Sequence, residues 1–181
     1  MSHSNLVLVP IDFSDCALGV VRRAASIARE QDARLLLLHA AEPPEGLPID
    51  AIVGSEDGKE RLPAGQYLLH NAEKRMTTYV QEAEKAGVQV NHRVDFGRAA
   101  DVILSVAGQV AATTIVLGTH GRTGISRLIL GSVSEEVSRR AECPVVTVRT
   151  QHKPHCEAGS CSWCATHVTE QLHQLRVEND G

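Results

Sequence analysis

The chain has few aromatic residues, little excess charge and no long apolar run. These shortages argue against an aromatic core, a nucleic-acid partner and a membrane span. Aromatic residues make up only 3% of the 181 residues, so the core must be built from Val, Leu, Ile and Ala. The net charge of −4 provides no positive field to attract nucleic acid, and we expect no nucleic-acid partner. No apolar run approaches the roughly 18 residues that a membrane span needs, and we expect no membrane association.

Cysteine is scarce in most of the chain and gathers near its end. Two of the five cysteines precede residue 150 and three follow it: Cys16, Cys143, Cys156, Cys161 and Cys164. An odd number of cysteines without a secretory leader favours a reducing, cytoplasmic location over a disulfide framework. We therefore predict a cytoplasmic protein with a body of residues 1–150 and a Cys/His-rich tail of residues 151–181.

The body alternates strand-like segments with segments of helical spacing. Five short, mostly apolar segments predict strands: Asn5–Pro10, Arg34–Ala41, Val88–Val94, Thr113–Leu117 and Pro144–Val148. Helical spacing of apolar residues lies between them, in residues 17–28, 64–86, 98–110 and 132–140. This alternation is typical of an α/β, doubly wound fold, a five-stranded parallel sheet with helices on both faces.

The ends of the helices also carry local signals. We expect Ser14 or Asp15 to cap the first helix, and Gly87 to end the second one. The segment from Glu42 to Pro63 is rich in Pro, Gly and acidic residues, which predicts a long loop.

Polar residues and glycines follow the first and fourth predicted strands. Asp12 and Ser14 come directly after the first, and the run Gly118–Gly124 (GTHGRTG) directly after the fourth. Glycines let a backbone approach a phosphate closely, and the helix that Gly131 and Ser132 open has free N–H groups that favour an anion. Doubly wound folds bind ligands where the strand order reverses, so these segments predict a nucleotide site in which Asp12 accepts from ribose hydroxyls.

A purely structural interpretation of these residues stays open. The chain has neither a Walker P-loop nor a G-x-G-x-x-G run after its first strand. The segment Ser132–Glu135 (SVSE) matches a capping box, which needs no ligand, and Asp12 can simply cap the first helix.

Taken together at their spacings, the motifs are more specific. Three of them form a set: Pro10-x-Asp12-x-Ser14, Leu38-His39-Ala40, and the pattern G-x2-G-x9-G-[ST] at Gly118, Gly121, Gly131 and Ser132. With this set, residues 4–149 resemble the universal stress protein family, in its ATP-binding branch.

The resemblance implies a fold, an assembly and a ligand. It implies a strand order of 3-2-1-4-5 and a homodimer in which the last strands, here Pro144–Val148, meet across the two-fold axis. The implied ligand is ATP, with or without Mg²⁺, and the implied protein partner is not identified by the sequence.

It also implies a role for each matching position. Asp12 would contact ribose or adenine, and the backbone of Ala40 would contact adenine. The remaining positions would border the ribose and phosphates or hold the phosphates: Leu117, Gly118, Gly121, Arg122, Gly131, Ser132 and Val133.

The tail has the residues for a metal site and an apolar helical stripe. Cys164 and His167 lie three residues apart, on one face of a helix expected over residues 162–177, with Cys161 one turn earlier. Cys156 or His155 can return from the preceding loop as a further ligand, and with Cys156 the set is three thiolates and one imidazole, which suits tetrahedral zinc. Redox chemistry at the C-x-x-C motif, an iron–sulfur cluster and a disordered tail with spare thiols are the alternatives.

These features support one principal function and two alternatives. The principal one is an ATP-binding stress-response regulator that acts through nucleotide-dependent conformation or partner binding, with a zinc clip in its tail. No acid–base pair stands beside the glycine run, so no catalytic residue is assigned and catalysis is not expected. The alternatives are a thiol or metal sensor on a dimeric scaffold, and a slow ATPase.

Overall fold

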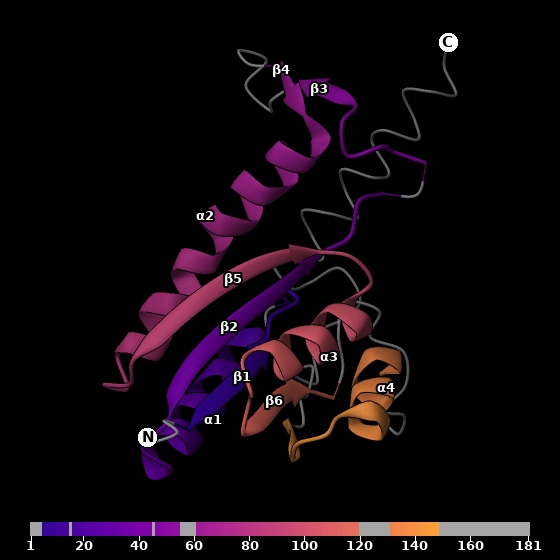
Figure 1. The fold of residues 1–181 in the computed structure, drawn as a ribbon. Coiled ribbons are helices and arrows are strands. Elements are labelled where there is room, and N and C mark those ends of the chain that lie inside the picture. The colour runs from indigo at the N-terminus through magenta and orange to yellow at the C-terminus, as the bar shows by residue number, and fades with distance from the viewer. Residues whose placement is uncertain (1–4, 15, 45, 55–60, 120–130, 149–181) are drawn as a thin grey trace, which may run out of the picture.

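The computed structural model describes residues 5–14, 16–44, 46–54, 61–119 and 131–148. A parallel five-stranded sheet runs through it in the order β5-β2-β1-β6-β7 (Figure 1). Its strands are β1 (Leu6–Pro10), β2 (Arg34–Ala41), β5 (Val90–Phe96), β6 (Thr114–Gly118) and β7 (Val145–Val148). Counting only these five strands in chain order gives 3-2-1-4-5, which confirms the expected topology.

Helices cover both faces of this sheet, because alternate residues of each strand point to opposite sides. Helices α1 (Ala17–Glu30) and α2 (Ala64–Glu84) share one core cluster with Val7 and Val9. Helices α3 (Ala99–Gln109) and α4 (Ser132–Arg140) share the other with Leu8.

The core is aliphatic, as the shortage of aromatic residues requires. The largest side chains that are fully buried come mainly from β1, β2 and β6, and they include Val7, Leu8, Val9, Leu35, Leu37, Leu38, Ile115 and Val116. Burying one such side chain contributes roughly 1.5–3 kcal/mol. The sheet edges β5 and β7 are only partly buried, so the most deeply buried part of the sheet is β2, β1 and β6.

The prediction of an uninterrupted loop from Glu42 to Pro63 is wrong. Strands β3 (Ile52–Gly54) and β4 (Arg61–Pro63) form an antiparallel pair within it. Each strand has three residues and is at least partly exposed, so neither leaves an alternating apolar pattern in the sequence. The two strands are held by backbone pairing, which the hydrophobic pattern of the sequence does not reveal.

The ends of the first two helices differ in how well they were predicted. Helix α1 follows Cys16, which makes no side-chain cap, so the expected cap by Ser14 is wrong; Asp15 lies outside the described residues. Gly87 follows α2 with a φ of 73°, a conformation that suits glycine at the end of a helix.

Two predicted features lie outside the described residues: most of the glycine run, with Gly121 and Arg122, and the whole tail with its expected helix and zinc ligands. Within the described ranges, no helix is long and apolar enough to cross a membrane.

Candidate functional site

The first part of the candidate site is the turn at the end of β1. Asp12 is half-buried, and its Oδ1 atom accepts hydrogen bonds from the backbone N–H of Ser14 at 3.0 Å and from its hydroxyl at 2.8 Å. This side-chain turn is typical of Asp at a reversal of the chain. No described residue donates to the second carboxylate oxygen, Oδ2, so one acceptor atom remains for a ligand hydroxyl.

The turn is anchored by Phe13, the residue after Asp12. Its ring is only 4% exposed and lies 4.1 Å from the His39 ring and 5.7 Å from the Tyr79 ring, between centroids. Anchoring by a buried ring restricts the positions that the neighbouring carboxylate can take.

The second part is the meeting of the end of β6 with the start of α4. The N–H of Gly131 donates to the carbonyl of Thr119 at 2.8 Å, and the Ser134 hydroxyl donates to the carbonyl of Gly118 at 2.6 Å. Both bonds join residues that are more than ten positions apart in the chain. They hold the first turn of α4 against the carboxyl end of β6.

The start of α4 has no side-chain cap. Gly131 takes the N-cap position, so Ser132 is the first helical residue, and the expected capping box of Ser132 and Glu135 does not form. Ser132 and Val133 are exposed. The free N–H groups of this first turn therefore retain the capacity to bind an anion.

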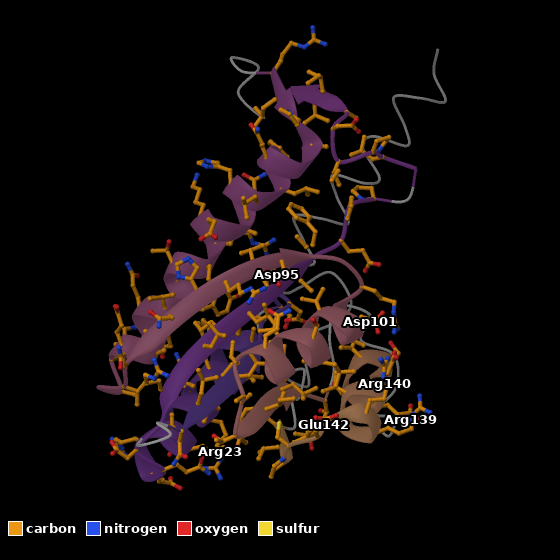
Figure 2. The ribbon with its side chains drawn as sticks, in the orientation of Figure 1. Arg23, Asp95, Asp101, Arg139, Arg140 and Glu142 are labelled. Atoms are coloured by element: carbon orange, nitrogen blue, oxygen red, sulfur yellow. The ribbon has the colours of Figure 1, made fainter. Side chains whose placement is uncertain are left out.

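These two parts lie beside each other. Strands β1 and β6 are neighbours, and the strand order reverses between them because β2 lies on the other side of β1. Six of the expected nucleotide residues lie at or just beyond the carboxyl ends of these two strands: Asp12, Leu117, Gly118, Gly131, Ser132 and Val133. Ala40 lies near the carboxyl end of β2, paired in register with Asp95, which Figure 2 labels.

The expected metal ligands lie outside the described residues, so their arrangement stays a prediction. Cys156, Cys161, Cys164 and His167 all lie in the tail, beyond the described residues. In the part of the chain that is described, no group of three or more His, Cys, Asp or Glu side chains is placed to hold a metal ion.

A network of ion pairs, which the sequence patterns did not reveal, joins α3 to α4. Arg98 donates two hydrogen bonds to Asp101, at 2.8 and 2.9 Å, and two to Glu136, both at 2.7 Å. Arg140 also contacts both carboxylates. Asp101 and Arg140 are labelled in Figure 2. Hydrogen bonds from Arg98 and then Arg140 lower the pKa of Glu136 to about 2, so the network is charged at neutral pH and fastens α4 to α3.

Known proteins are similar to this chain in sequence. A universal stress protein of Methanocaldococcus jannaschii is 34% identical over 149 residues, which are 81% of this chain and 83% of that protein. A putative universal stress protein of Staphylococcus aureus is 31% identical over 150 residues, 82% of this chain and 86% of that protein.

A solved structure and a family description agree with these relatives. The crystal structure of a universal stress protein in complex with cAMP is 29% identical, with a TM-score of 0.61, over 83% of this chain and all of that one. The description of the universal stress protein family matches residues 4–149. This chain therefore belongs to the universal stress protein family.

Proposed function

We propose that this protein binds an adenine nucleotide at the carboxyl ends of β1 and β6 and regulates a stress response through it. The observation that carries this proposal is the meeting of Asp12 with the uncapped start of α4 where the strand order reverses. The solved relative that holds cAMP supports an adenine nucleotide as the ligand class. Nucleotide-dependent conformation or partner binding is the proposed mode of action.

The described residues fit the two ends of such a ligand. Asp12 Oδ2 accepts a hydrogen bond from a ribose hydroxyl, while Oδ1 stays engaged with Ser14. The N–H groups at the start of α4 and the Ser132 hydroxyl donate to phosphate oxygens. Ala40 and Leu117 border the adenine and ribose, and Gly118 and Gly131 admit the phosphates.

ATP, with or without Mg²⁺, is the nucleotide that we propose. Arg122 and Gly121 would add charge and close backbone approach at its phosphates. A conformational regulator needs two distinguishable states, and the site with and without bound ATP would supply them. The alternative of slow ATP hydrolysis predicts phosphate release that Asp12→Ala abolishes.

Isothermal titration calorimetry tests the proposal with ATP, AMP and cAMP. The full-length protein should bind at least one of them, and Asp12→Asn should weaken that binding about tenfold because a hydrogen bond to a charged acceptor is lost. Glu84→Gln is the matched control, since it removes the same charge at an exposed site on α2. Absence of binding by all three nucleotides, or equal binding by Asp12→Asn, would contradict the proposal.

We also propose that the protein is a homodimer that pairs through β7. This strand is an edge of the described sheet, and no other described strand pairs with its outer side. Sedimentation equilibrium should give the mass of two chains, and a monomer mass would contradict the assembly.

The zinc clip in the tail remains a separate proposal. Its support is the ligand set of Cys156, Cys161, Cys164 and His167. Native mass spectrometry of protein purified without chelator should find one zinc ion per chain, and Cys161→Ser with Cys164→Ser should remove it. A metal-free chain whose thiols oxidise readily would favour the thiol-sensor alternative.

A further inference from the structure

The two carbonyl groups that flank Asp12 are each held by a side chain from another element. The carbonyl oxygen of Ile11 lies 2.7 Å from Nδ1 of His39, at the end of β2. A carbonyl oxygen only accepts, so this ring nitrogen carries the hydrogen. The carbonyl oxygen of Phe13 accepts from Nη2 of Arg75, on α2, at 3.3 Å. The peptide group before Asp12 and the one between Phe13 and Ser14 are therefore fixed from outside the turn.

The backbone between these carbonyls has an unusual conformation. Phe13 has a φ of 60°, in the left-handed region that bulky residues rarely adopt. Such a conformation persists only where the surrounding contacts hold it, and it is concentrated at functional sites. Relaxation of Phe13 to an ordinary conformation would turn the chain and carry the neighbouring Asp12 carboxylate to a new direction.

The side chains that hold the carbonyls also hold the Phe13 ring. The Arg75 guanidinium lies 4.2 Å from the centre of the ring, where a cation is attracted to the aromatic face. The His39 ring lies against it at 4.1 Å. His39 and Arg75 each contact the turn twice, once at a backbone carbonyl and once at the Phe13 ring.

We propose that Arg75 and His39 are positioning residues for Asp12. They fix the direction of its carboxylate before a nucleotide arrives, so that binding need not order the turn. The inference rests on the nucleotide site proposed above, and it extends that site to α2, because Arg75 lies on this helix and donates to the Phe13 carbonyl. Movement of α2 would then change nucleotide affinity without touching the ligand.

A double-mutant cycle between Arg75 and Asp12 tests this inference. ATP affinity is measured by calorimetry for the wild type, Arg75→Met, Asp12→Asn and the double variant. Arg75→Met should weaken binding about tenfold, as expected for one lost hydrogen bond to a charged donor. Because Arg75 acts through Asp12, the double variant should bind no more than about twofold more weakly than Asp12→Asn.

Two further variants separate positioning from general destabilisation. Arg75→Lys keeps the cation but cannot both cover the ring and reach the carbonyl as the planar guanidinium does, so its loss should be smaller, about threefold. Arg23→Met removes the same side chain at an exposed site on α1, labelled in Figure 2, and should bind ATP like the wild type.

Each outcome bears on the inference. Arg75→Met that binds ATP like Arg23→Met would overturn it, and so would tenfold losses that simply add in the double variant. In both cases binding by the wild type and its loss in Asp12→Asn would leave the proposed function standing. A wild type that binds no ATP, AMP or cAMP would overturn both together.

Discussion

The two halves of the candidate site are held by different physical means. The half that presents Asp12 depends on buried contacts: Phe13 is 4% exposed and lies among aromatic rings and backbone hydrogen bonds. The half that presents the start of α4 depends in part on the surface, since the Arg98 and Arg140 side chains of its ion-pair network are 52% and 45% exposed.

This difference separates what is fixed from what responds to the solution. Buried packing does not depend on ionic strength, whereas exposed charges are screened by salt. The ribose half should therefore be the constant part of the site, and the phosphate half the part that salt and acid loosen.

Loss of the Phe13 ring should be the most damaging change. Phe13→Ala removes the side chain that His39, Tyr79 and Arg75 all contact. It leaves a cavity, and the free energy of unfolding should fall by about 3 kcal/mol. Urea denaturation measures this value. A loss below about 1 kcal/mol would mean that the turn is not anchored by burial.

The buried hydrogen bond of the other half should matter less. Ser134→Ala leaves the Gly118 carbonyl without its partner, and Ser134 is only 5% exposed. The expected loss of stability is about 1 kcal/mol. Ser138→Ala, at an exposed position of the same helix, is the control that should change little. Equal denaturation midpoints for the two variants would show that this bond does not hold α4.

Breaking the surface network should have a smaller effect that salt removes. Arg98→Met deletes four hydrogen bonds to two carboxylates, but solvent compensates exposed charges. At low salt, Arg98→Met should lose less stability to unfolding than Ser134→Ala. This loss should vanish near 1 M NaCl, where the screening length is about 3 Å. Arg139→Met, exposed on α4 and labelled in Figure 2, is the control. A loss independent of salt would contradict the comparison.

Acid should weaken the same network within a defined range of pH. The pKa of Glu136 falls from 4.5 to about 2 on folding, first because of Arg98 and then because of Arg140. A lowered pKa stabilises the folded state fully above about pH 4.5, and this contribution is lost as the pH falls toward 2. Glu136→Gln should therefore be less stable than the wild type at pH 7, and the difference should shrink as the pH falls through about 2. A constant difference across this range would contradict the assignment.

The sheet and its helices were predictable because their signals are local. Apolar runs such as Arg34–Ala41 mark strands buried on both faces, and helical spacing marks the segments between them. The β3–β4 hairpin was missed because its short strands bury too little to leave a pattern. The strand order itself came from the family resemblance rather than from periodicity.

Sequence motifs predict the candidate nucleotide-binding residues but not the contacts that support them. Asp12 and Gly131 stand in motifs with characteristic spacing, so the sequence alone pointed to them. The contacts of Ser134 with Gly118 and of Arg75 with Phe13 span 16 and 62 residues, and no local pattern marks such pairs. The capping box failed by one position, since Gly131 rather than Ser132 takes the N-cap.

Amide chemical-shift mapping with ATP locates the nucleotide site on the sheet. A site between β1 and β6 should give its largest shifts in two segments, residues 11–14 after β1 and residues 117–119 with 131–134 around the start of α4. Asp12→Asn should reduce these shifts at equal ATP concentration. Shifts concentrated at the β3–β4 hairpin or along β7, with these segments unchanged, would contradict a nucleotide site between β1 and β6.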